Sequence, residues 1–372
     1  MTGLDGWPVL VGLFPANWRE LGRSSGAVRR LRGFGSVDAL LHTLLLHVGC
    51  GWSLRETSVQ ARLAGIADVS DVALLKRLRD AEPWLRQMCE ALLEDNGISP
   101  PPRIAGRTVR ALDATIVREP GKTGSQWRLH YSLRLPTLEC DHFRLTSTRG
   151  PDAAERFGHF QFQAGELVLA DAGYCHAAGI AAVVAAQADV CVRLNPHGLA
   201  LFDAEGERFS LLERLAHLRA AGDSASWPVR IRSGEQWIEG RVCAIRKTRR
   251  AIEQAQRRLT RKRQQGKTLS GPETRAFAQY VLVFTTLPEA GATTQQVLEA
   301  YRLRWQVELV FKRFKSIAQF GHVPKHDDQS CRAWLYGKLL LALLTQRLDR
   351  IGKAISPWGY LLPQEPCTQS VA

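Results

Sequence analysis

Apolar residues recur at helical intervals between about residues 36 and 96. Examples are "SVDALLHTLLLHV" and "SDVALLKRLRDAEPWLRQMCEALL". Serine is a preferred helix N-cap, so Ser70 is expected to begin one of these helices. The pattern predicts a helical N-terminal domain over residues 1–100.

One part of this domain contains two adjacent helical patterns, in "SLRETSVQARLAGIADVSDVALLKRLRD", with Gly65 in the turn between them. The second helix would carry Lys76 and Arg79. This is the outline of a helix-turn-helix, whose second helix contacts DNA. A helix pair with a solvated basic face has the same pattern, so both interpretations stay open.

After the proline-rich "GISPPPRIAG" the pattern changes to that of strands. Three consecutive strands are predicted at "TVRALDATIV", "WRLHYSLRL" and "DHFRLTSTR". A fourth, "ELVLADAGY", an alanine-rich helix, "HAAGIAAVVAAQ", and a fifth strand, "DVCVRL", follow. Strands joined by short helices predict an α/β sheet with a parallel part over residues 101–196.

Residues 197–290 do not continue this alternation of strands and helices. A two-stranded ribbon turning at Ser233–Gly234 precedes a highly charged segment and another strand, "YVLVFTTL". We interpret this region as a mostly β insertion that also carries the basic segment. A long helix begins only at about Thr293, so residues 291–350 return to the α/β core and residues 351–372 form a C-terminal tail.

The chain is strongly basic. It has 50 Lys and Arg against 36 Asp and Glu, a formal charge of +14, which favours a polyanionic partner such as nucleic acid. The run 246–267 alone holds ten Lys and Arg and one acid. Its candidate DNA contacts are Arg257, Arg258, Arg261 and Lys262. A basic soluble enzyme and a solvated helix face are the alternatives.

Two classes of protein are disfavoured. The eight cysteines include no CxxC pair, so neither a zinc module nor a small disulfide-linked scaffold is expected. No apolar run approaches the roughly 18–20 residues of a membrane span, and no charged region precedes an apolar signal. We therefore expect a cytoplasmic protein with reduced thiols and no membrane partner.

Two aspartates stand in very apolar strand segments. Asp113 lies within "RALDATIV", and Asp171 ends "LVLADAGY" at the edge where α/β sheets bind ligands. A carboxylate in such a place must be paired, hydrogen-bonded or bound to a metal. Each could be a structural aspartate, but two on one sheet suggest a divalent cation.

A third acid lies in the basic helix pattern "YRLRWQVELVFKRFK". On one continuous helix Tyr301, Arg304, Glu308 and Lys315 would all lie within about 60° of one another. A solvated face in which Glu308 pairs with Arg304 and Lys312 is the alternative.

These three segments together resemble the DDE transposases of bacterial insertion sequences, specifically the group numbered four. That group has the pattern Y(2)R(3)E(6)K, which Tyr301, Arg304, Glu308 and Lys315 match at every position. "LDAT" and "LADAGY" supply the two preceding aspartates in the expected order. The resemblance covers about residues 105–345, including the β insertion, and the N-terminal helices match only in general character.

The resemblance implies an RNase H-like catalytic core with a mostly β insertion, preceded by a helical domain. Asp113, Asp171 and Glu308 would then bind two Mg²⁺ or Mn²⁺ ions for phosphoryl transfer. Tyr301, Arg304 and Lys315 would hold phosphates of the transposon end, with Lys312 nearby.

Members of the group that resemble this chain are expected to cut by a hairpin route and then join the ends to target DNA. A flipped base is typically held by an aromatic residue. Tyr280 is the candidate for this role, and the alternative is that Tyr280 is an ordinary core aromatic.

The family also implies a homodimer that pairs the two terminal inverted repeats, and association with the bacterial nucleoid. An RNase H-like nuclease that does not join DNA, or a catalytically silent DNA-binding repressor, are the alternative functions.

Overall fold

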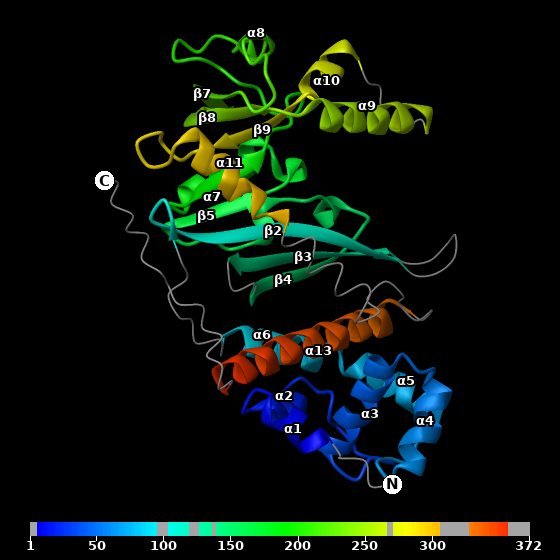
Figure 1. Cartoon of the computed structure of the whole chain (residues 1–372). Coiled ribbons are helices and arrows are strands. Elements are labelled where there is room, and N and C mark those ends of the chain that lie inside the picture. Colours follow the sequence, from blue (N-terminus) through cyan, green and yellow to red (C-terminus); the bar gives the residue numbers. More distant parts are fainter. Residues whose placement is uncertain are drawn as a thin grey trace. The chain divides into compact units, whose positions relative to one another are not determined.

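The computed structural model describes residues 6–94, 103–118, 126–135, 139–265, 271–305 and 327–355. It contains two compact units, one made of helices and one built around a sheet (Figure 1). The helical unit consists of α1 (Trp7–Gly12), α2 (Trp18–Ser24), α3 (Val37–Cys50), α4 (Leu54–Leu63), α5 (Asp71–Asp80), α6 (Glu82–Glu94) and α13 (Asp328–Ile355).

The helical unit confirms the predicted N-terminal helices. Ser36, Ser53 and Ser70 cap α3, α4 and α5, because each hydroxyl accepts a bond from the amide three residues later. The helix α13 packs against α6, α3 and α5 (Figure 1). The sequence pattern assigned this stretch to the α/β core, whereas its apolar residues pack with the N-terminal helices instead.

The sheet unit is a mixed α/β structure. Its strands are β1 (Arg103–Ile104), β2 (Arg107–Arg118), β3 (Gln126–Leu135), β4 (Glu139–Ser147), β5 (Glu166–Ala170), β6 (Asp189–Arg193), β7 (Ser224–Ser233), β8 (Gln236–Arg246) and β9 (Tyr280–Thr285). Its α-helices are α7 (Ala177–Ala185), α8 (Leu211–Leu215), α9 (Arg249–Gln264), α10 (Pro272–Phe277) and α11 (Thr294–Arg302). Short 3-10 helices are η1 (Pro151–Ala153), η2 (Phe157–His159) and η3 (Ala172–Tyr174).

The described strands form one sheet in the order β4-β3-β2-β5-β6-β9-β8-β7, with β1 paired to β2 alone. The pairs β2–β5 and β5–β6 are parallel, as predicted, and β3–β4 is an antiparallel hairpin. The ribbon β7–β8 lies within the predicted insertion, and β9 pairs antiparallel with both β6 and β8. The inserted strands therefore extend the central sheet instead of forming a separate β structure.

Helices cover both faces of the sheet at β6. Val190 and Val192 pack in one core cluster with Ile180 and other residues of α7. Cys191, between them, points the other way and its Sγ donates to the carbonyl of Val297 in α11 at 3.8 Å. Alternate residues of a strand face opposite sides, so α7 and α11 form layers on either side of the sheet.

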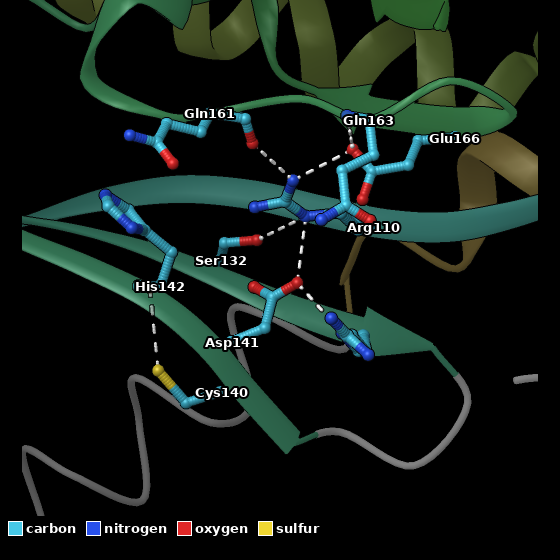
Figure 2. Close-up of polar contacts among 9 residues, drawn as sticks. Arg110, Ser132, Cys140, Asp141, His142, Gln161, Gln163 and Glu166 are labelled. Carbon is cyan, nitrogen blue, oxygen red and sulfur yellow. Dashed lines mark hydrogen bonds and ion pairs between the residues drawn. The ribbon is translucent and has the colours of Figure 1, made fainter. Parts of the chain in front are cut away.

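A buried charge network ties together four strands (Figure 2). Arg110 on β2 is 4% exposed, and its guanidinium lies 2.9 Å from both Asp141 on β4 and Glu166 on β5. The same group donates to Ser132 on β3 at 3.2 Å and to the carbonyl of Gln161 at 2.7 Å. Buried charges are tolerated when paired and hydrogen-bonded, as they are here.

Three histidines pack together beside β3 and β4. The rings of His130 and His159 are 4.1 Å apart, and His142 Nε2 lies 3.0 Å from the carbonyl of His159. Burial, together with His159 and nearby arginines, lowers the pKa of His130 to about 3. Burial also lowers the pKa of His142 and of His159. All three imidazoles are therefore neutral in the folded chain at pH 7.

This cluster makes stability depend on pH. An unfolded histidine has a pKa of about 6.5, so below that pH the unfolded chain binds protons that folded His130 cannot. The free energy of unfolding should fall by about 2 kcal/mol between pH 6.5 and pH 5 from His130 alone. Urea denaturation at several pH values measures this change in the free energy of unfolding. His130→Gln should flatten the profile, and an unchanged slope in that variant would contradict the assignment.

Candidate active site

Asp113 and Asp171 are brought together by the register of β2 and β5. These parallel strands pair up to Ala111 and Leu169, and each aspartate lies two residues beyond that pair. Asp171 caps η3, and its Oδ1 accepts the amide of Gly173 at 2.8 Å. Two carboxylates far apart in sequence therefore share one edge of the sheet.

The environment of Asp113 is unfavourable for a lone negative charge. Burial raises the pKa of Asp113 to about 7, and the charges of Asp171 and Glu155 add to the effect. The amide of Ala114 and the guanidinium of Arg304 act in the opposite direction. Arg304 lies 3.6 Å from Asp113 Oδ2, and both side chains are largely buried. A carboxyl with so high a pKa in a functional position is typical of catalytic and cation-binding sites.

A further acid, Glu155, lies beside Asp171. It comes from the segment between β4 and β5, and its Oε1 accepts a bond from Arg128 Nη1 at 3.1 Å. Burial and then the charge of Asp171 raise the pKa of Glu155, against the influence of Arg128. Sequence reasoning missed Glu155, because a single acid between two strands carries no pattern of its own and only the fold brings it to the aspartates.

Tyr301 and Arg304 lie together, as predicted, but not on one continuous helix. The helix α11 begins where predicted, with Thr293 as its N-cap, and ends at Arg302. The amides of Leu303 and Arg304 bond to carbonyls three residues back, which tightens the chain into a turn. The prediction of an uninterrupted helix from residue 301 was wrong at this point. The Arg304 guanidinium still lies 5.7 Å from the centre of the Tyr301 ring.

The other two residues of that motif, Glu308 and Lys315, lie outside the described residues, as does Lys312. Within the described chain, no three His, Cys, Asp or Glu side chains are grouped closely enough to hold a metal ion. The proximity of Glu308 to the two aspartates stays a prediction.

The structure places Tyr280 in the core. It is 7% exposed, and its hydroxyl donates to the carbonyl of Leu215 at 3.0 Å and accepts from Arg246 at 2.8 Å. A base cannot stack on a ring that is enclosed in this way. The prediction that Tyr280 holds a flipped base is corrected here, and the alternative of a core aromatic is the one observed.

The helix α9 presents the predicted basic surface. Arg257, Arg258 and Arg261 are exposed, and Lys262 lies on the same helix. An open hollow along α9 is lined by Glu253, Gln256, Arg257, Thr260 and Arg261. Figure 1 shows α9 at the border of the sheet unit, next to α10.

Cations also gather where α9 approaches the ends of β6 and β8. Lys247 follows β8, and burial together with Arg193 and Arg258 lowers its pKa to about 8. Arg193 is exposed at the end of β6, next to the strand that leads to Asp171. Sequence reasoning missed Arg193 and Lys247, since a single cation after a strand carries no pattern.

The predicted pair of adjacent helices forms, as α4 and α5. Residues 64–70 connect them, a longer connection than the roughly 3–4 residues of a helix-turn-helix. Lys76 is exposed on α5, whereas Arg79 donates to Asp327 at 2.6 Å. The ion pair engages Arg79 within the helical unit, and a contact of either residue with DNA stays a prediction.

The donor set at Asp113 and Asp171 suits a hard divalent cation. Mg²⁺ and Mn²⁺ prefer carboxylate oxygens, and a cation would stabilise both carboxylates in their charged form. Such an ion would act as a Lewis acid on a phosphoryl oxygen. The residues present therefore fit the metal that the sequence predicts.

Comparison with known proteins decides the family. The family described as "Transposase DDE domain" matches residues 144–344. Transposase InsL of insertion sequence element IS186A from Escherichia coli is 31% identical over 348 residues, which cover 91% of this chain and 93% of that protein. The chain belongs to the DDE transposase family. It is thus an enzyme of metal-dependent DNA cleavage and joining, as predicted from the resemblance of the three segments that carry Asp113, Asp171 and Glu308.

Other transposases match over different lengths. The transposase of IS421 from Escherichia coli is 31% identical over 91% of this chain and 93% of its own length. The transposase of IS231F from Bacillus thuringiensis is 26% identical over 30% of this chain and 23% of its own length. Among solved structures, the catalytic domain of human endonuclease V matches 66% of this chain and 97% of its own, with a TM-score of 0.27 and 12% identity.

Two further findings bear on the sequence-based expectations. None of the cysteines in the described part of the chain is in a disulfide. Among the described helices, none is both long and apolar enough to cross a membrane.

Proposed function

We propose that this DDE transposase cuts the ends of its insertion sequence and joins them to target DNA by two-metal phosphoryl transfer. The observation that carries the proposal is that Asp113 and Asp171 lie side by side just beyond the last paired residues of β2 and β5, in a chain of this family. In an RNase H-like core the first acid lies on the first core strand and the second just after the fourth. Counting β2 as the first core strand, Asp113 and Asp171 have those positions.

In this proposal Asp113, Asp171 and Glu308 hold two Mg²⁺ or Mn²⁺ ions. The ions would activate the attacking oxygen and stabilise the leaving 3′ oxygen in an in-line displacement. Arg304, held beside Tyr301, would place a phosphate of the transposon end against the aspartates. Lys315 and Lys312 would add phosphate contacts.

Cleavage is proposed to follow the hairpin route. A freed 3′ hydroxyl attacks the opposite strand and releases the flanking DNA, and the hairpin is then opened by water. A homodimer would pair the two terminal inverted repeats, with the protein associated with the nucleoid. We further propose that the helical unit and α9 contact the DNA at positions away from the catalytic residues.

The test uses DNA carrying a terminal repeat, with the full-length protein and Mg²⁺. Products that migrate as hairpins on a denaturing gel support the route. Transfer of a pre-cut 3′ end into plasmid DNA supports joining, and it should disappear with EDTA. Cleavage without joining would support the alternative of an RNase H-like nuclease. Absence of metal-dependent nicking would support the alternative of a DNA-binding repressor.

The basic surface of α9 yields a prediction about salt. Arg257 and Arg261 are exposed and proposed to contact phosphates, so Arg257→Gln or Arg261→Gln should each lower the slope of log affinity against log salt by about 1. Filter binding at several salt concentrations measures the slope. Arg232→Gln changes the net charge equally at a residue bound to Glu235 and should leave the slope unchanged. Equal slopes in all variants would exclude α9 as a phosphate contact.

A further inference from the structure

A third carboxylate, Glu155, approaches the two aspartates from the segment between β4 and β5. We propose that Glu155 is a positioning residue that strengthens the binding of divalent cations at Asp113 and Asp171. The inference rests on the proposed function of those aspartates as cation ligands. It adds a residue from the segment between β4 and β5 to the site.

Gly173 provides the space for this approach. A Cβ at residue 173 would collide with Oε2 of Glu155 and would lie 3.1 Å from Oδ1 of Asp171. Both carboxylates therefore border the same small volume above the glycine. The backbone of residue 173 does not have a positive φ, so the lack of a side chain matters for space and not for backbone conformation.

Tyr174 supplies a second, independent observation. Its ring is fully buried, and within the described chain its hydroxyl has no hydrogen-bond partner. Burial and the charges of Glu155, Asp113 and Asp171 all raise the pKa of Tyr174, so the hydroxyl lies in the field of all three. A buried hydroxyl without a protein partner is stabilised when a ligand or water oxygen bonds to it.

The charges at the site favour a cation. Three carboxylates face two arginines, Arg304 at Asp113 and Arg128 at Glu155. The Glu155 carboxylate is already paired with Arg128 at 3.1 Å, so we assign it a place outside the direct ligands. In this position the negative charge of Glu155, held in place by Arg128, strengthens the binding of the cation to Asp171.

The experiment measures Mn²⁺ binding to the full-length protein by titration calorimetry, without DNA. Glu155→Gln should weaken Mn²⁺ binding by about 10- to 100-fold, the usual effect of removing an outer-shell partner. Asp152→Asn is the matched control, because Asp152 is a nearby exposed acid bound to Arg144, and it should bind Mn²⁺ as the wild type does. Unchanged affinity in Glu155→Gln would overturn the inference.

Gly173→Ala tests the same idea with the charge of Glu155 intact. The new methyl group should displace the Glu155 carboxylate and weaken Mn²⁺ binding. If it acts through Glu155, the double variant should bind no more weakly than Glu155→Gln alone. Fully additive losses would overturn the inference, since the methyl group would then act elsewhere.

Asp113→Asn separates this inference from the proposed function. If Asp113→Asn leaves Mn²⁺ affinity unchanged, the proposed metal site itself is wrong. If Asp113→Asn abolishes binding while Glu155→Gln does not alter it, only the role of Glu155 is wrong.

Discussion

Replacing either strand-borne aspartate, as Asp113→Asn or Asp171→Asn, is expected to lower the rate of Mg²⁺-dependent cleavage by about 1,000-fold or more. Such a loss corresponds to about 4 kcal/mol of transition-state stabilisation. The reason is that asparagine has nearly the shape of aspartate but lacks the charge that holds a divalent cation. Cleavage of a labelled transposon end under single-turnover conditions measures the rate.

The same substitutions should not unfold the protein. Burial and neighbouring carboxylates make a charged Asp113 costly, so Asp113→Asn should be at least as stable as the wild type. Asp152→Asn, at an exposed ion pair, should keep the full cleavage rate. Wild-type rates in both active-site variants would show that the aspartates are structural, the alternative that the sequence left open.

Removing the buried guanidinium of Arg110 is expected to destabilise the sheet unit by about 3–5 kcal/mol. In Arg110→Met, Glu166 and Asp141 would stay buried without their main cationic partner. The cost of an uncompensated buried charge exceeds what the new apolar contacts return. Urea denaturation compares the free energies of unfolding.

Two further variants check this explanation. Arg249→Gln breaks an exposed pair with Glu253 and should change the stability by less than about 1 kcal/mol. Adding Glu166→Gln and Asp141→Asn to Arg110→Met should restore part of the loss, because the unpaired charges are then gone. If the triple variant is as unstable as Arg110→Met alone, charge burial is not the cause.

Much of the site could be predicted from local sequence. An aspartate within an uninterrupted apolar strand is chemically conspicuous, because its desolvation must be offset by a partner. Asp113 and Asp171 were found in this way, and the structure brings them to one sheet edge. Their order along the chain and the spacing of Tyr301, Arg304, Glu308 and Lys315 were sufficient to predict the family.

The local sequence pattern gave wrong predictions where the same residues are compatible with two different environments. Tyr280 begins a predicted strand and could contact a DNA base or the core, but β9 lies between β6 and β8 and the Tyr280 ring is enclosed. The residues after Tyr301 continue a helical pattern, but bonds to carbonyls three residues back turn the chain at Leu303 and Arg304. The apolar face of α13 does not by itself specify a partner. It was predicted to pack on the α/β core, but it packs against α6.

By itself the sequence determined most strands of the sheet unit, the alanine-rich helix α7, the start of α11 near Thr293, the two aspartates and the basic character of α9. These follow from periodicity and composition, which act over a few residues. Only the tertiary structure decided that β7, β8 and β9 extend the sheet, that Arg110 is neutralised across four strands, and that Glu155 stands beside Asp171. The physical reason is that strand pairing and burial join residues distant along the chain, and no local pattern encodes which of them meet.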